Sequence, residues 1–262
     1  MQGRRIVVTR ARGQAAPLVD RLAELGAEAI DAPAIRIVDP PDPKAVEQAL
    51  LRLREYDLVI FTSQNAVHRV LEGLSAIGLE PTALRNGKVA AIGARTAEAL
   101  RSHGVEVDFV PEDFRAEGVL DSLADHPLVG RRVLLPRALV ARNELPDGLR
   151  ERGAVVDVVP VYQTVSDEEG LLVARQALVL GVDAVTFTSS STVRNFLTGI
   201  GADDLAAHEL LDGVCLASIG PVTSDTLRDF GFTPTVEAEP YLVEALVEAL
   251  VRHFSEAKEA NT

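Results

Sequence analysis

Short apolar runs alternate with longer amphipathic segments along almost the whole chain. The runs are rich in Val, Ile, Leu and Ala, and the segments between them carry apolar residues every three or four positions. Runs of this kind are typical of parallel strands covered by helices on both faces. The pattern therefore predicts an α/β fold with open parallel sheets. The clearest runs are residues 6–9, 58–63, 88–93, 133–136, 184–189 and 214–220.

The sequence also repeats itself at a nearly constant offset, which takes Thr62 to Thr188 and Gly93 to Gly220. A constant offset over several segments indicates two copies of one αβ unit. Right-handed crossovers place the carboxyl ends of all strands of such a unit at one edge of its sheet. We therefore expect two flavodoxin-like lobes. The matching segments are residues 4–37 with 131–164, 56–74 with 182–200, and 87–112 with 213–238.

Composition narrows the classes of function. The 262 residues carry a formal net charge of −13, which disfavours binding to nucleic acid or to an anionic membrane surface. No apolar run is long enough to span a bilayer. The first residues, MQGRRIVVTR, lead into a strand-like run without the features of a signal peptide, so we expect a cytoplasmic protein.

Several common catalytic and cofactor motifs are absent. The sequence has neither a dinucleotide-binding glycine fingerprint nor a P-loop, and its five histidines are not at metal-ligand spacing. The single cysteine, Cys215, excludes an intrachain disulfide and is expected to be an inert core residue. The serines near Ser189 lack the nucleophile elbow of acyl-transfer enzymes. These absences disfavour dinucleotide and P-loop chemistry, a metal site and acyl-transfer catalysis.

Four loops place hydroxyl side chains between a strand end and a helix start. Such a position offers unpaired backbone N–H groups and a partial positive charge, both of which favour anions. Taken singly, each hydroxyl is better explained as a simple helix cap. Taken together, the four loops predict a cleft that binds a ligand with several carboxylates. The candidate residues are Thr62, Ser63, Thr96, Ser189, Ser191 and Thr223.

Arginines and one tyrosine add to these loops. Arg10 and Arg12 follow the first strand, and Arg137 and Arg142 follow its counterpart in the second copy. They could bind carboxylates through paired N–H groups or serve solubility alone. Tyr162 lies at the end of the strand that links the copies. It is either a packing residue or a weak general acid, because a free phenol is protonated at neutral pH.

The segments V-Y-Q-T-V (161–165), F-T-S at both strand ends, G-x-x-T-A (93–97) and I-G-P-x-T (219–223) resemble those of the uroporphyrinogen-III synthase family. The resemblance runs over nearly the whole chain. It implies two lobes joined by a two-stranded connection, one formed by residues 1–36 and 165–262 and the other by residues 37–164. The repeat alone would have placed a boundary near residue 128. Two loops depart from the family pattern, and in one of them Ser190 replaces a common proline.

The resemblance implies a lyase that closes hydroxymethylbilane, a linear tetrapyrrole with eight carboxylates, to uroporphyrinogen III, inverting the last pyrrole ring and releasing water. It makes Tyr162 the acid at the leaving hydroxyl. It also implies that Thr96, Ser191 and Thr223 line the cleft, with Thr62 and Ser63 on the facing lobe. Arg10, Arg137 and Ser189 complete the expected substrate contacts. No cofactor is implied.

Two other classes of function remain as alternatives. One is a non-catalytic, two-lobed module that binds a small anion, and the other is a two-domain glycosyltransferase. The first is disfavoured by the absent signal peptide and the second by the absence of a nucleotide-sugar pocket signal. For partners, we expect the small-molecule substrate, a monomer, and at most a transient contact with hydroxymethylbilane synthase.

Overall fold

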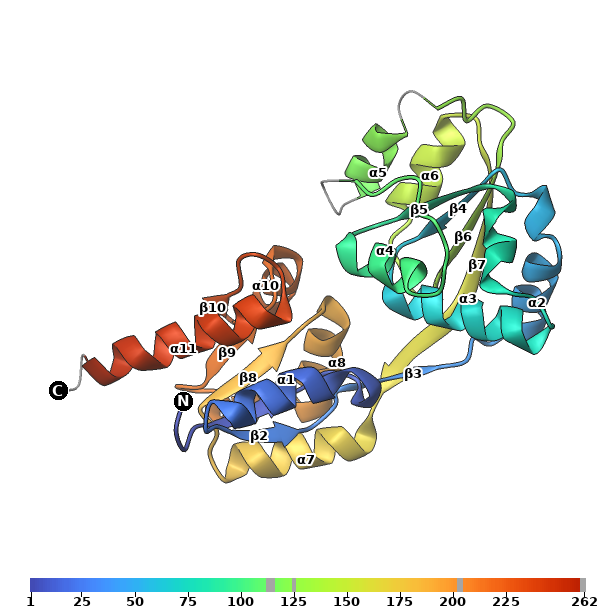
Figure 1. The fold of residues 1–262 in the computed structure, drawn as a ribbon. Helices are drawn as coiled ribbons and strands as arrows, with labels where there is room; N and C mark the ends of the chain where they lie inside the picture. Colours follow the sequence, from blue (N-terminus) through green and yellow to red (C-terminus); the bar gives the residue numbers. More distant parts are fainter. Residues whose placement is uncertain (112–115, 124–125, 202–204, 260–262) are drawn as a thin grey trace. The chain divides into compact units, whose positions relative to one another are not determined.

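The computed structural model describes residues 1–111, 116–123, 126–201 and 205–259. It divides into two compact units: unit 1 is Met1–Arg36 with Val165–Thr262, and unit 2 is Ile37–Thr164. The chain passes between the units once within β3 (Ile35–Val38) and once within β7 (Val155–Ser166), which are neighbouring strands of one sheet (Figure 1). Both units are α/β, with parallel pairing in their sheets, as the sequence predicts.

Unit 1 has the strand order of flavodoxin. Its sheet runs β10-β9-β8-β1-β2, which is 2-1-3-4-5 when the strands are numbered along this unit's own chain. The strands are β1 (Arg5–Val8), β2 (Glu28–Asp31), β8 (Ala184–Phe187), β9 (Cys215–Ser218) and β10 (Val236–Glu237). The helices are α1 (Arg12–Glu24), α7 (Glu168–Val179), α8 (Ser190–Ile200), α9 (Leu205–Leu210), α10 (Pro221–Asp229) and α11 (Val243–Glu259).

Unit 2 has the same spatial order of strands, but its first strand along the chain is β3, at the edge of the sheet. Its sheet runs β3-β7-β6-β4-β5, so β7, β6, β4 and β5 correspond to β2, β1, β8 and β9. A single parallel bridge between Ala90 and Phe109 stands where unit 1 has β10. The other strands are β4 (Leu58–Phe61), β5 (Lys88–Ala91) and β6 (Arg132–Ala138). The helices are α2 (Pro43–Leu51), η1 (Leu53–Glu55), α3 (Gln64–Ala76), η2 (Pro81–Asn86), α4 (Ala94–Arg101), α5 (Ala116–Ser122) and α6 (Glu144–Glu151).

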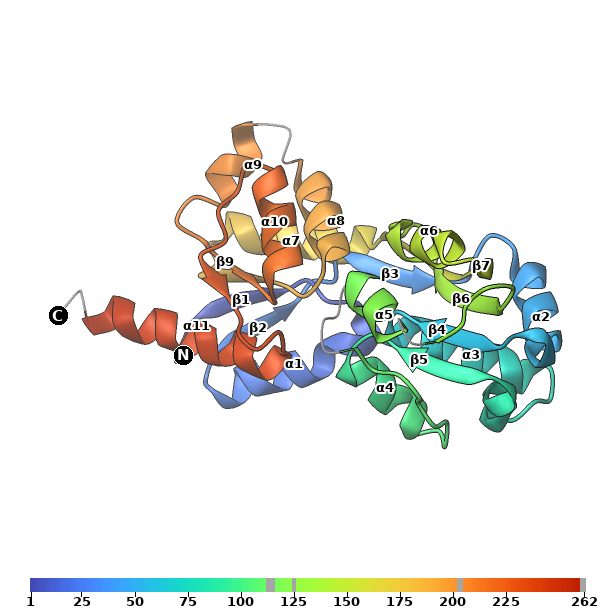
Figure 2. The same ribbon diagram turned by 90° about the horizontal axis from the view of Figure 1, so that it is seen from above.

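Strand β4 explains why the sequence run is apolar at every position. Val59 and Phe61 point into the core formed with α2, α3 and α4, whereas Leu58 and Ile60 point into the core formed with α5 and α6. Figure 2 shows these helices on the two sides of the sheet. Successive side chains of a strand face opposite sides, so a strand covered on both sides needs apolar residues throughout.

One carboxylate anchors the two central strands in each unit. In unit 2, Asp57 accepts the backbone N–H of Arg132 at 2.9 Å and pairs with Arg131 at 2.7 Å. In unit 1, Asp183 accepts the backbone N–H of Arg5 at 2.8 Å and pairs with the Arg4 side chain. The same contact at equivalent positions supports the internal duplication. It fixes the start of β6 beside β4, and the start of β1 beside β8.

Candidate active site

Each sheet has a point where its strand order reverses. In open α/β sheets, ligands bind outside the carboxyl ends of the strands at this point, because the loops there diverge to opposite faces. In unit 2 the reversal lies between β6 and β4, and in unit 1 between β1 and β8. The candidate residues Ser63 and Ser189 lie two residues after the ends of β4 and β8, and Arg10 lies two residues after the end of β1. The topology therefore brings the predicted residues of each unit to the expected edge.

Ser63 and Tyr162 form a hydroxyl pair at the reversal point of unit 2. The Oγ atom of Ser63 lies 3.1 Å from the Oη atom of Tyr162. Ser63 is also the N-cap of α3, because its Oγ accepts the backbone N–H of Ala66 at 3.1 Å. The ring of Tyr162 packs in the core of unit 2, and the residue is 7% exposed. Core packing of the ring therefore holds the phenol at the helix start.

A bulge in β7 sets the direction of the Tyr162 side chain. Arg137 pairs with Pro160, but Ala138 pairs with Tyr162, so Val161 is left out of the register. A one-residue shift moves every later side chain to the other face of the strand. Only the small side chain of Ala138 stands opposite Tyr162 on the neighbouring strand. Bulges depend on tertiary pairing, so the sequence could not reveal this one.

The helix starts of unit 1 carry a cluster of hydroxyls. Ser189 caps α8, where its Oγ accepts the backbone N–H of Thr192 at 3.2 Å and lies 2.9 Å from the Oγ of Ser191. Ser190 donates to the carbonyl of Val222 at the start of α10, at 3.2 Å. The capping interpretation of Ser63 and Ser189 is thus correct. The remaining backbone N–H groups at these helix starts can still bind an anion.

Two predicted hydroxyls are less accessible than the rest. Thr96 lies in the first turn of α4 and Thr223 in the first turn of α10, and they are 5% and 4% exposed. Thr96 belongs to unit 2, the same unit as Thr62 and Ser63. The grouping that set Thr62 and Ser63 on a lobe facing Thr96 was therefore wrong. All three hydroxyls of unit 2 follow β4 or β5.

The arginines of the two units differ in their surroundings. Arg12 forms ion pairs with Asp167 at 3.3 Å and Glu169 at 2.7 Å. Arg137 makes no ion pair with any carboxylate in the described parts of the chain, and it donates to the Arg142 carbonyl at 2.6 Å and to Asn143 at 2.8 Å. Burial, followed by the nearby charge of Arg150, lowers the pKa of Arg137 from its ordinary value. Among the described residues, Arg137 is therefore held in place by uncharged groups, and the nearby negative charge of Asp147 acts on its pKa in the opposite direction to burial and Arg150.

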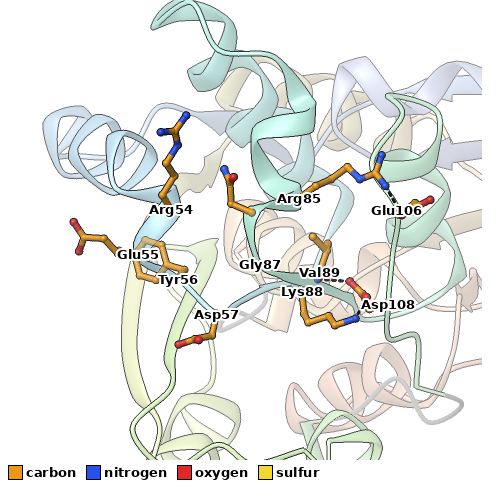
Figure 3. Close-up of a pocket in the computed structure, with 11 residues that line it drawn as sticks. Arg54, Glu55, Tyr56, Asp57, Arg85, Gly87, Lys88, Val89, Glu106 and Asp108 are labelled. Carbon is orange, nitrogen blue, oxygen red and sulfur yellow. Dashed lines mark hydrogen bonds and ion pairs between the residues drawn. The ribbon is translucent and has the colours of Figure 1, made fainter.

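A pocket of about 510 Å³ lies at the opposite edge of unit 2, near the starts of β4 and β5. Figure 3 shows its side chains. Arg85 pairs there with Glu106 at 2.6 Å, and Lys88 pairs with Asp108 at 2.6 Å. These cations are already neutralised by carboxylates of the same pocket. An acidic ligand therefore gains less here than at the helix starts.

Other chemistries find little support in the described residues. Within residues 1–111, 116–123, 126–201 and 205–259, no group of three or more His, Cys, Asp or Glu side chains is placed to hold a metal ion. No helix in those ranges is long and apolar enough to cross a membrane. Cys215 is buried, and burial raises the pKa of its thiol to about 12, so it carries no thiolate at neutral pH.

The fold and these edges define a two-unit α/β protein whose helix starts and arginines suit an acidic ligand. The family model described as uroporphyrinogen-III synthase HemD matches residues 16–248. The uroporphyrinogen-III synthase of Synechococcus elongatus is 32% identical over 257 residues, which cover 95% of this chain and 94% of that protein. The chloroplastic uroporphyrinogen-III synthase of Oryza sativa subsp. japonica is 30% identical over 266 residues, covering 97% and 83%.

A solved structure agrees with these relatives. The crystal structure of a mutant uroporphyrinogen III synthase from Thermus thermophilus matches with a TM-score of 0.71 at 25% identity, over 97% of this chain and 100% of that chain. The chain therefore belongs to the uroporphyrinogen-III synthase HemD family. This confirms the family resemblance and the lyase activity in tetrapyrrole biosynthesis that the resemblance implies.

Proposed function

We propose that this chain closes hydroxymethylbilane to uroporphyrinogen III with inversion of the terminal ring, and that Tyr162 and the helix starts of both units carry the reaction. The observation that carries the proposal is the hydroxyl pair of Tyr162 and Ser63 at the reversal point of unit 2. A phenol held at a helix start by core packing can donate a proton to a ligand at that edge.

The binding proposal follows from the charge of the substrate. Its eight carboxylates match helix starts that offer unpaired N–H groups and a partial positive charge. Arg137 adds a cation without an ion-pair partner in the described residues. A local anion site of this kind works in a chain with a net charge of −13 because N–H groups bind at short range. The proposed substrate contacts are Arg10, Thr62, Ser63, Thr96, Arg137, Ser189, Ser191 and Thr223.

The proposed reaction conserves every atom of the substrate except one water. Tyr162 gives its proton to the substrate hydroxyl as the C–O bond breaks, which leaves water, a cationic azafulvene and a phenolate. The substituted carbon of the terminal pyrrole attacks the azafulvene, and the resulting spiro-pyrrolenine fragments and recloses with that ring inverted. The ring carbon loses its proton at closure, and this proton restores the phenol. There is no net oxidation, so no redox cofactor is needed.

Most of the catalytic effect is expected to be positional. Hydroxymethylbilane cyclises spontaneously without inversion, so the protein has to hold the terminal ring where its substituted carbon reacts. Fixing reacting groups in this way can lower a barrier by about 7–11 kcal/mol, whereas a general acid lowers it by about 3–5 kcal/mol.

We further propose that the chain acts as a cytoplasmic monomer and receives its substrate in a transient contact with hydroxymethylbilane synthase. Rapid transfer would limit spontaneous closure of the unstable substrate. The net charge of −13 disfavours nucleic acid and anionic membranes as partners.

Tyr162→Phe tests the acid. Freshly made hydroxymethylbilane is supplied to both proteins, and the rate of closure is measured. We expect the variant to turn over about ten- to a hundredfold more slowly, at or below the lower end of the range for a general acid, because most of the catalytic effect is positional. A wild-type rate would remove Tyr162 from this role while leaving the family assignment intact.

A further inference from the structure

The Oγ atom of Ser63 takes part in two hydrogen bonds, and only one of them can use the serine proton. Its Oγ accepts the backbone N–H of Ala66 at 3.1 Å, which satisfies the start of α3. The same Oγ lies 3.1 Å from the Oη of Tyr162. A serine hydroxyl has one proton and two acceptor lone pairs. Because the cap uses only a lone pair, the Ser63 proton remains available for Tyr162.

In the hydrogen bond between Ser63 and Tyr162, the choice of donor decides whether the Tyr162 proton is available to a ligand. If Ser63 donates to Tyr162, the phenol proton is free to point to a ligand. When that proton has left, the phenolate can only accept, and Ser63 is placed to donate to it. A hydrogen bond to an ionised oxygen is about twice as strong as a bond between neutral groups.

The duplicated unit shows that capping alone does not require this arrangement. Ser189 stands at the position equivalent to Ser63 and caps α8 in the same way. Among the described residues, its Oγ contacts hydroxyls of the same helix start and no tyrosine. The contact with Tyr162 is therefore additional to the cap.

We propose that Ser63 is a positioning residue for the proposed acid: it holds the Tyr162 hydroxyl, leaves the phenol proton free for the substrate, and stabilises the phenolate after transfer. This inference rests on the proposed function. Ser63 keeps its own proton throughout, and the phenolate regains a proton from the ring carbon that closes. Ser63 contributes to substrate binding through the backbone N–H groups of its helix start, which the substitutions below leave in place, so loss of the side chain should affect kcat and not KM.

Three substitutions separate the hydroxyl from the cap. Ser63→Ala removes both, Ser63→Gly removes the hydroxyl at a cap cost of only a few tenths of a kcal/mol, and Ser63→Thr keeps both. Asp42→Ala is the matched control for cap loss, because Asp42 caps α2 of the same unit by accepting the backbone N–H of Ala45 at 3.1 Å. Thermal melts serve as the check that each variant is folded.

With hydroxymethylbilane as the probe, we expect Ser63→Ala and Ser63→Gly to lower kcat about five- to twentyfold with KM within about twofold. Ser63→Thr should recover kcat to within about threefold, and Asp42→Ala should leave kcat unchanged. In a Tyr162→Phe background, Ser63→Ala should have almost no further effect.

An equal loss of kcat from Ser63→Ala in both backgrounds would overturn the inference, as would a rise in KM with kcat unchanged. Both results require a wild-type protein that makes the type III isomer, so they leave the proposed function standing. A wild-type protein that makes no type III isomer would overturn the function and the inference together.

Discussion

Thr226 donates a hydrogen bond to Ser190 at 2.9 Å and thereby joins α10 to the first residue of α8. Ser190 in turn donates to the Val222 carbonyl at 3.2 Å. Two helix starts of unit 1 are thus held at a fixed separation. If each binds a substrate carboxylate, that separation affects how well the substrate fits.

Ser190→Ala tests this link. We expect KM to rise about three- to tenfold with little change in kcat, because roughly 1 kcal/mol of hydrogen bonding that fixes the two helix starts is lost. The measurement is steady-state kinetics with hydroxymethylbilane. Ser190 is the first residue of α8, where proline is favoured, so Ser190→Pro should fold normally and serves as a second variant without the hydroxyl. Unchanged KM in both variants would show that the link does not affect substrate binding.

Arg137→Gln tests the cation without an ion pair. The guanidinium is held by the Arg142 carbonyl and by Asn143, and no described carboxylate forms an ion pair with it. Removing it should raise KM about tenfold or more, because a hydrogen bond to a charged group contributes about 1.5–3 kcal/mol. Arg85→Gln is the control, because Arg85 is already paired with Glu106 at the opposite edge. Equal effects of the two substitutions on KM would contradict the proposed role of Arg137.

Gly170→Ala should destabilise the fold. A Cβ atom on Gly170, in the first turn of α7, would overlap with the carbonyl oxygen of Pro33. Forced overlap with backbone costs about 1–3 kcal/mol. Gly13 lies in α1 with open space around its Cβ position, so Gly13→Ala should stabilise by about 0.5–1 kcal/mol. Chemical denaturation measures both. A Gly170→Ala variant as stable as wild type would show that Pro33 moves away to make room for the Cβ atom.

Acid should weaken the anchor at Asp57. Its hydrogen bond from the backbone N–H of Arg132, with the pairing to Arg131, lowers the pKa of Asp57 below its ordinary value of 3.8. A lowered pKa in the folded state gives stability that is present above the unfolded value and is lost as pH falls through the folded value. Asp57→Asn should therefore melt at a lower temperature than wild type at pH 7, and the difference should shrink below about pH 4.

Asp20→Asn is the control for this pH series, because Asp20 is exposed on α1 and lies outside the carboxylate anchors of the two sheets. Its melting temperature should stay close to that of wild type, because a substitution at an exposed position outside the anchors changes stability little. A difference between Asp57→Asn and wild type that persists undiminished down to about pH 2.5 would contradict the electrostatic origin of the effect.

The fold could be predicted largely from the sequence because its strands are buried on both faces. Strands such as β4 leave continuous apolar runs, and the repeat marks the duplicated order of elements. No continuous apolar run in the sequence marks the single bridge at Phe109, which stands where unit 1 has β10. Its backbone pairing does not depend on an apolar pattern.

The candidate site could be predicted only as a set of positions. Strand ends followed by hydroxyls identified Ser63 and Ser189, which the structure places at the reversal points of the two sheets. The approach of Tyr162 to Ser63 depends on a bulge at Val161, and the link from Ser190 to Thr226 depends on how α8 packs on α10. Both arise from tertiary contacts between residues far apart in the chain, which no local pattern encodes.

The most direct test of the central claim is the partition of product isomers. Fresh hydroxymethylbilane is incubated with the purified chain or with buffer, the products are oxidised, and type I and type III porphyrins are separated. We predict that the chain gives mainly type III, whereas buffer alone gives mainly type I. An isomer ratio identical to that of the buffer would contradict the claim that these two units control how the substrate closes.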